Sequence, residues 1–164
     1  MFSRQLQEKA ELLLEEFRVA SKILVTAESC TGGLVSACLT EIPGSSDVFT
    51  HGFVTYSNKS KIETLNVSES LIERAGAVSE EVSVAMALGA LARTPADLSL
   101  AVTGVAGPGG GTLEKPVGLV HFAVVGRNTA TSHQKIIIPG ERSVVRMTSV
   151  SISLDMLLES IRHL

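Results

Sequence analysis

Residues 26–33, TAESCTGG, decide how the rest of the chain can fold. They follow a short apolar run, ILV, and precede a longer one, LVSACLT. This order predicts a buried strand over residues 22–26 and a helix from Gly32 and Gly33 to about Thr40. Between the two elements lie a carboxylate, two hydroxyls and a thiol, which a plain connection would not need.

The pattern of strand followed by helix continues outward from this stretch. Further strands are predicted over 48–57, 97–104, 117–126 and 131–139, and helices over 3–17, 58–66, 68–76, 79–93 and from about 141. The last two strands are joined by only four residues, RNTA, so they should be antiparallel. No linker or repeat divides the sequence. We expect one α/β domain over residues 1–164, a three-layer α/β/α fold with a mixed central sheet.

Composition excludes several classes of protein. Hydrophobic residues make up 45% of the 164 residues and charged residues 19%, which excludes disorder. The net charge of −3, the single Tyr and the lack of a Lys/Arg cluster disfavour a nucleic-acid partner. No apolar run approaches the ~20 residues of a membrane span. The acidic N-terminal helix is unlike a secretory signal, so a cytoplasmic protein with no membrane partner is expected.

Polar residues follow three of the predicted strands. In an open α/β sheet, ligands bind beyond the carboxyl ends of the strands, so these residues should meet at one edge. The first strand is followed by Glu28, Ser29 and Thr31, the second by Tyr56, Asn58 and Lys61, and the third ends in Thr103 and Gly104.

Two glycine-rich turns could bind an anion such as a phosphate. ESCTGG brings backbone N–H groups to a helix start, and TGVAGPGGG, with Gly107 and Gly109, could form an anion nest. Neither is a P-loop or a G-x-G-x-x-G motif. Arg142 and Arg146 are four residues apart and could reach a phosphate or a carboxylate. The alternative for ESCTGG is a plain capped turn, that for TGVAGPGGG is a flexible surface loop, and that for the two arginines is a solvated helix face.

Lys61 is the strongest single candidate for a chemical role. A lysine at the mouth of a buried sheet can become a base if desolvation lowers its pKa by ~3 units, which costs ~4 kcal/mol. It could then activate a hydroxyl of Ser29, Ser46 or Tyr56. The alternative is a solvated lysine beside Lys59.

Metal chemistry has little support in the sequence. The four histidines show no ligand spacing, and Cys30 and Cys38 form neither a C-x-x-C motif nor a metal pattern. No metal and no cofactor are therefore expected. Cys30 is a third candidate nucleophile, but no histidine is placed in the sequence to activate it.

The sequence resembles the C-terminal domain family of the competence/damage-inducible protein CinA. The resemblance lies in TAESCTGGLVSACLTEIPGSSDVFTHGFVTYSNKSK, GAVSEEV, TGVAGPGGG, KPVGLV and ERSVVR, which cover nearly the whole chain in order. For a stand-alone domain, the resemblance implies hydrolysis of the carboxamide of nicotinamide mononucleotide to nicotinate mononucleotide and ammonia, in pyridine nucleotide salvage. Longer relatives carry an N-terminal domain resembling molybdopterin-binding proteins, whose activity is not expected here.

Together, the resemblance and the residues imply a metal-free amidohydrolase. A serine hydroxyl would attack the amide, activated by Lys61 and assisted by Tyr56, and backbone N–H groups would hold the oxyanion. Ser29 is preferred as the nucleophile and Ser46 is the other candidate. A non-catalytic module that binds a nucleotide, or serves competence or DNA damage, is the rival interpretation. The apolar composition also makes a homo-oligomer plausible.

Overall fold

The strands form one five-stranded sheet in the order β2-β1-β3-β4-β5 in the computed structural model, which describes residues 2–127 and 130–163. β1 pairs in parallel with β2 and with β3, whereas β4 is antiparallel to both β3 and β5. The sheet is therefore mixed, as predicted. The strands are β1 (Leu24–Glu28), β2 (Phe49–Val54), β3 (Leu98–Gly104), β4 (Leu119–Gly126) and β5 (Ser132–Ile137).

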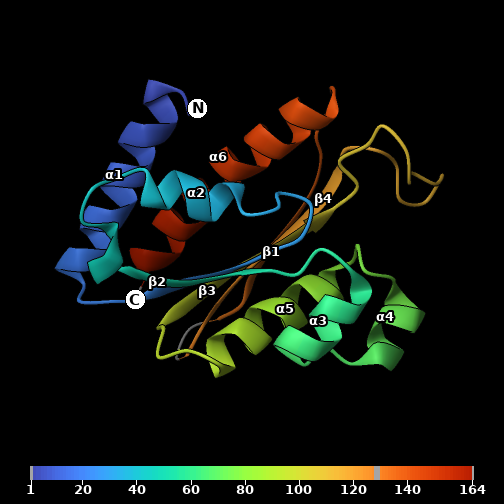
Figure 1. Cartoon of the computed structure of the whole chain (residues 1–164), viewed down its shortest axis with the longest axis horizontal. Helices are drawn as coiled ribbons and strands as arrows, with labels where there is room; N and C mark the ends of the chain where they lie inside the picture. The colour runs from blue at the N-terminus through green and yellow to red at the C-terminus, as the bar shows by residue number, and fades with distance from the viewer. Residues whose placement is uncertain (1, 128–129, 164) are drawn as a thin grey trace.

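Helices cover both faces of the sheet, which confirms the three-layer fold. Figure 1 shows α1, α2 and α6 on one face, with α3, α4 and α5 on the other. The elements are α1 (Arg4–Val19), α2 (Leu34–Thr40), the 3₁₀ turn η1 (Ser45–Asp47), α3 (Asn58–Leu65), α4 (Glu69–Ala75), α5 (Glu80–Ala92) and α6 (Arg142–Ile161). The predicted caps Ser3, Ser68 and Ser79 each accept a hydrogen bond from a first-turn N–H group.

The sheet separates two hydrophobic cores. Leu100 of β3 belongs to the core beneath α1, α2 and α6, whereas Ala101 belongs to the core against α5. Every residue of β1 is buried because helices cover it on both sides. This explains why the start of the strand follows the continuous apolar run ILV rather than an alternating pattern.

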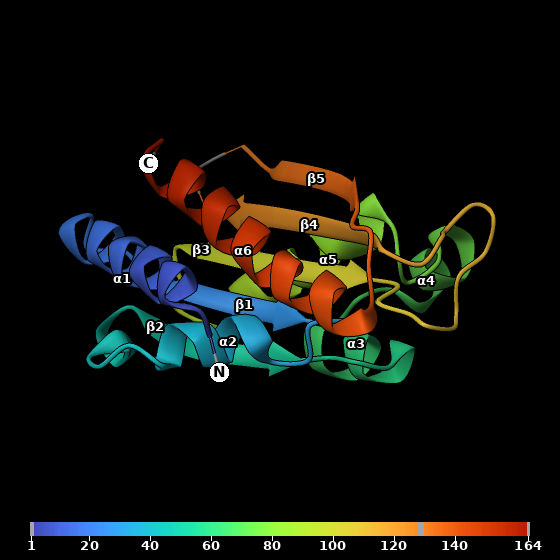
Figure 2. The same cartoon turned by 90° about the horizontal axis from the view of Figure 1, so that it is seen from above.

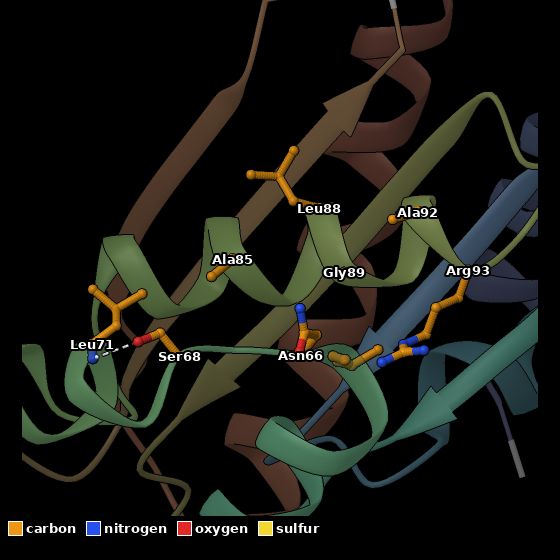
Figure 3. Close-up of a pocket in the computed structure, with 9 residues that line it drawn as sticks. Asn66, Ser68, Leu71, Ala85, Leu88, Gly89, Ala92 and Arg93 are labelled. Atoms are coloured by element: carbon orange, nitrogen blue, oxygen red, sulfur yellow. Dashed lines mark hydrogen bonds between the residues drawn. The ribbon is translucent and has the colours of Figure 1, made fainter.

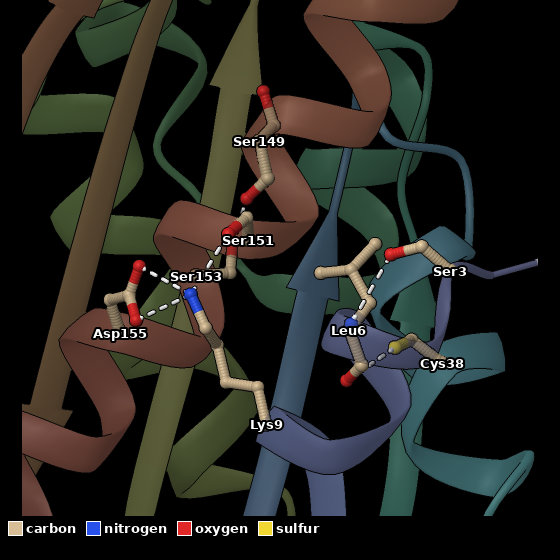
Figure 4. Close-up of polar contacts among 8 residues, drawn as sticks. All are labelled: Ser3, Leu6, Lys9, Cys38, Ser149, Ser151, Ser153 and Asp155. Carbon is tan, nitrogen blue, oxygen red and sulfur yellow. Dashed lines mark hydrogen bonds and ion pairs between the residues drawn. The ribbon is translucent and has the colours of Figure 1, made fainter.

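Polar contacts attach α1 to its neighbours (Figure 4). Lys9 Nζ lies 2.9 Å from Ser151 Oγ and 2.7 Å from an oxygen of Asp155, both on α6. Ser149 and Ser153, buried on the same helix, donate to carbonyls of their own helix. The two helices are thus held together by an apolar contact with ion pairs at its margin, Lys9 with Asp155 and Glu16 with Arg162 just after the end of α6.

The predicted boundaries of the first two strands were wrong by one to three residues. β1 begins at Leu24 and runs to Glu28, because its pairing with β2 and with β3 continues to that residue. β2 ends at Val54, after which Thr55 donates its N–H to Glu28 O. Of the predicted four-residue link before β5, Asn128 and Thr129 lie outside the described residues.

A shallow hollow of about 540 Å³ lies between α5 and the connection from α3 to α4 (Figure 3). Its lining includes Asn66, Leu71, Leu88 and Arg93. Gly89 allows α5 to pack closely against the end of α3, since a Cβ at this position would press on the backbone carbonyl of Leu65. Among the described residues, no helix has the length and apolar character needed to cross a membrane.

Candidate active site

The carboxyl ends of β1, β2 and β3 meet at one edge of the sheet, as their parallel pairing requires. Figure 2 shows that α3, the long loop after β3 and the start of α6 gather at this edge. An inner cavity of about 200 Å³ opens there. It is lined by Ser29, Cys30, Tyr56, Asn58, Lys61, Ala77, Val78, Thr103, Gly104, Ala106 and Arg142.

A buried serine–lysine pair lies in this cavity. Lys61 is only 1% exposed and Ser29 only 7% exposed. Lys61 Nζ is 2.9 Å from Ser29 Oγ, 2.8 Å from Thr55 O and 3.3 Å from Tyr56 O. The structure thus brings together two residues that lie 32 positions apart in the sequence.

The environment of Lys61 shifts its protonation equilibrium toward the neutral amine, although the ammonium still dominates at neutral pH. Burial lowers the pKa of Lys61 to about 8, and no carboxylate of the described residues forms an ion pair with it. A neutral amine has two N–H donors and one lone pair. The carbonyls of Thr55 and Tyr56 can only accept, so they take the two donors and leave the lone pair for the Ser29 hydroxyl. This arrangement suits a general base.

The neighbouring thiol is poorly suited to nucleophilic attack. Burial raises the pKa of Cys30 to about 12, and the nearby Glu28 carboxylate acts in the same direction. A thiol with this pKa is protonated at neutral pH. The raised pKa of the thiol and the contact of Lys61 with the Ser29 hydroxyl therefore favour Ser29 over Cys30.

Glu28 has an internal role that the sequence did not reveal. One of its carboxylate oxygens accepts from the N–H groups of Gly33 and Val35 at 3.0 Å, and the other from the N–H and hydroxyl of Ser36 at 2.8 and 2.6 Å. The carboxylate thus occupies the start of α2, where an anion from outside was expected. Glu28, Gly32 and Gly33 do not line the cavity, so we do not propose them as substrate contacts.

Ser46 lies too far from Lys61 to join the Ser29–Lys61 pair, which corrects the second nucleophile candidate. It is exposed in η1, immediately before the start of β2, whereas Lys61 follows the end of the same strand. A six-residue strand places these two ends about 20 Å apart. PGSSDVF belongs to the stretch that carries the family resemblance, but the resemblance did not show at which end of the strand Ser46 lies.

The two arginines of α6 brace the site from the other side. Arg146 donates to Cys30 O at 3.1 Å and to Thr31 O at 2.8 Å, and so holds the turn that carries Ser29. Arg142 donates to Gly107 O and to the Tyr56 hydroxyl, both at 2.9 Å. The hydroxyl of Tyr56 therefore faces Arg142, whereas its carbonyl contacts Lys61.

The remaining predicted residues divide between the cavity and its surroundings. Asn58, Thr103 and Gly104 line the cavity, and Thr103 donates its hydroxyl to Ala77 O at 2.9 Å. Thr31, Gly107 and Gly109 do not line it. The Thr31 side chain is fully buried, and Gly109 is exposed with open space around it.

Three lining residues were missed by the sequence interpretation of the site. Ala77 and Val78 come from the connection between α4 and α5, and Ala106 from the loop after β3. They are small or apolar, so their residue types carry no chemical signal. Only their position beside the predicted strand ends could have pointed to them.

The histidines lie apart from the cavity. His121 Nδ1 is 3.0 Å from His133 Nε2, and burial lowers the pKa of His121 to about 4. Within residues 2–127 and 130–163, no three His, Cys, Asp or Glu side chains are grouped to hold a metal ion.

The fold and the cluster define a class: a three-layer α/β/α domain with a buried serine–lysine pair at the carboxyl edge of a mixed sheet. The chain belongs to the CinA C-terminal domain family, which matches residues 6–161. It is similar to a CinA-like protein of Geotalea uraniireducens, with 48% identity over 141 residues. That match covers 86% of this chain but 33% of the relative, so the chain spans about a third of the length of such relatives.

Two solved structures of similar proteins superpose on nearly the whole chain. The competence/damage inducible protein CihA from Agrobacterium tumefaciens superposes with a TM-score of 0.95 at 42% identity, covering 99% of this chain and 98% of that one. The competence damage-inducible protein A (ComA) from Klebsiella pneumoniae gives a TM-score of 0.93 at 32% identity, covering 96% and 98%.

Proposed function

We propose that this domain is a metal-free amidohydrolase that converts nicotinamide mononucleotide and water to nicotinate mononucleotide and ammonia. The observation that carries the proposal is the 2.9 Å contact between Ser29 Oγ and the buried amine of Lys61. The carboxamide nucleotide as substrate comes from the family resemblance, and the serine–lysine pair supplies chemistry that such a substrate needs.

In the first half-reaction, neutral Lys61 takes the hydroxyl proton of Ser29 while Oγ bonds to the amide carbon. The tetrahedral intermediate then collapses. The C–N bond breaks, the Lys61 ammonium returns a proton to the leaving nitrogen, and ammonia departs. The Tyr56 hydroxyl, which Arg142 holds at the cavity, is a second candidate for this proton transfer.

In the second half-reaction, Lys61 deprotonates a water that attacks the acyl ester. The ester bond to Ser29 breaks, the acid leaves and Ser29 regains a proton. The oxyanion of both steps needs N–H donors. Cys30, next to the nucleophile, lines the cavity, so its backbone N–H lies close to the reacting carbonyl. We assign it to the oxyanion.

The test is ammonia release from nicotinamide mononucleotide with a chelator present. Wild type should release ammonia, and Ser29→Ala and Lys61→Met should lose about a thousandfold or more in kcat while still binding the nucleotide. Lys59→Met is the matched control, because Lys59 lies on the same helix but is 81% exposed, and its activity should be unchanged.

Two results would contradict the proposal. Full activity of Lys61→Met would remove the lysine from the mechanism. A folded wild-type protein that binds the nucleotide without releasing ammonia would instead favour a binding module.

A further inference from the structure

The connection between α4 and α5 supplies one wall of the inner cavity. This cavity wall consists of Ala77 and Val78, which lie in a segment without regular secondary structure. Three successive backbone carbonyls at the wall each accept a hydrogen bond from a different side chain. The pairs are Ala75 O with Lys115 Nζ, Gly76 O with Ser79 Oγ, and Ala77 O with Thr103 Oγ1. Side chains thus fix a segment that no helix or strand ladder holds.

The three side chains differ in where they come from. Ser79 is the N-cap residue of α5, so its bond stays within the connection. Lys115 comes from the long loop after β3, and Gly76 leaves room for it, because a Cβ there would meet Lys115 Nζ. Thr103 belongs to β3 itself. Its hydroxyl therefore ties the cavity wall to the sheet.

Strand β3 is a firm reference for the geometry of the site. It pairs with β1 on one side and with β4 on the other, and Thr103 is only 1% exposed. Val102 O accepts the backbone N–H of Ser29 at 2.9 Å, and the next residue, Thr103, donates to Ala77 O at 2.9 Å. Two consecutive residues of one strand thus hold the nucleophile and the cavity wall.

The hydroxyl is the part of Thr103 that this role needs. It has one O–H donor, which goes to the Ala77 carbonyl. Valine has the same shape but would set a methyl group against that carbonyl and leave it without a donor. The carbonyl would then turn toward water in the cavity and move the wall. Because the cavity measures only about 200 Å³, a small movement of the wall changes the fit of a ring.

We propose that Thr103 is a positioning residue: through the Ala77 carbonyl it holds the cavity wall at a set distance from Ser29, and so determines how well the inner cavity fits the ring that carries the amide. The proposal rests on the proposed function for the identity of that ring. Thr103 acts through the wall and takes no part in proton transfer. Its loss should therefore weaken substrate binding and leave the chemistry of Ser29 and Lys61 in place.

The experiment measures KM and kcat separately for ammonia release from nicotinamide mononucleotide. Thr103→Val should raise KM about 10-fold or more, with kcat within about threefold of wild type and the inflection near pH 8 retained. Thr103→Ser keeps the hydroxyl and should restore KM to within about threefold. Ser99→Ala is the matched control, because Ser99 is also buried in β3 but its hydroxyl makes no hydrogen bond within the described part of the chain.

A binding measurement separates the positioning role from the proposed reaction. In a Ser29→Ala background, calorimetry should show nicotinamide mononucleotide binding about 10-fold more weakly when Thr103→Val is added, and about equally well with Thr103→Ser. This result would support the role even if wild type released no ammonia, which would end the proposed function alone. Equal affinity with and without Thr103→Val, a loss confined to kcat, or Thr103→Ser as impaired as Thr103→Val would overturn it.

Discussion

At the scale of single residues, the buried side chains of Glu28 and Lys61 differ in the partners that surround them. Four donors surround the carboxylate of Glu28 and satisfy both of its oxygens. Lys61 meets only carbonyls and a hydroxyl, and burial lowers its pKa to about 8. Glu28 therefore stabilises the turn, and the lowered pKa of Lys61 fits the proton transfer that we propose for it.

The pKa of Lys61 predicts the pH dependence of activity. The base must be neutral, so kcat/KM should rise about tenfold per pH unit below pH 8 and level off above it. Stopped assays of ammonia release between pH 6 and 9.5 would measure this. A profile without an inflection near pH 8 would argue against Lys61 as the base.

Glu28→Gln should lower the free energy of unfolding by about 2–4 kcal/mol. The substitution keeps the size of the side chain but turns one acceptor oxygen into a donor that faces backbone N–H groups. Urea unfolding would measure the loss. Glu63→Gln, at an exposed position on α3, should change stability by less than about 0.5 kcal/mol. A loss below 1 kcal/mol for Glu28→Gln would contradict this account of the turn.

At the scale of elements, the site is held by contacts between segments rather than within them. The turn between β1 and α2 is braced by Glu28 from within and by Arg146 of α6 from outside. Ser29 stands between these two supports, so its orientation depends on a helix more than a hundred residues later. A sequence window around Ser29 does not contain this information.

Gly89→Ala tests the close packing of α5 against the connection after α3. Alanine gains about 1 kcal/mol in helix propensity, but its Cβ would press on the Leu65 carbonyl, which costs about 1–3 kcal/mol or more. We expect a net loss of about 1–2 kcal/mol, seen as a melting temperature lower by about 2–8 °C. Gly109→Ala, with nothing within 4 Å, should leave it unchanged, whereas a stabilised Gly89→Ala would contradict the packing.

At the scale of the whole molecule, the polarity of the sheet assembles the site. β1, β2 and β3 run in parallel, so polar residues that follow three distant strands meet at one edge of the sheet, which the connection between α4 and α5 also reaches. The same geometry places Ser46 at the opposite edge. Lys61 is buried only because these segments meet, so the free-energy cost of desolvating its amine arises only in the folded molecule.

This cost predicts how stability depends on pH. The pKa of Lys61 is about 8 in the folded protein and 10.5 as its ordinary value, so between these values the unfolded chain binds more protons. The unfolding free energy of wild type should therefore rise with pH relative to Lys61→Met, by up to about 3 kcal/mol between pH 8 and 10.5. Urea unfolding of both proteins at three pH values would show it, and a constant difference would contradict it.

Local sequence patterns determined the secondary structure, the two-sided burial of β1 and the convergence of polar residues at one edge. These features depend on periodicity, caps and strand order, which neighbouring residues specify. Only the tertiary structure decided that Ser29 rather than Ser46 meets Lys61, that Glu28 serves the turn, and that Arg142 contacts Tyr56 and Gly107. Each of these depends on which distant segment lies beside a given side chain, and that contact is set by packing of the whole sheet and its helices.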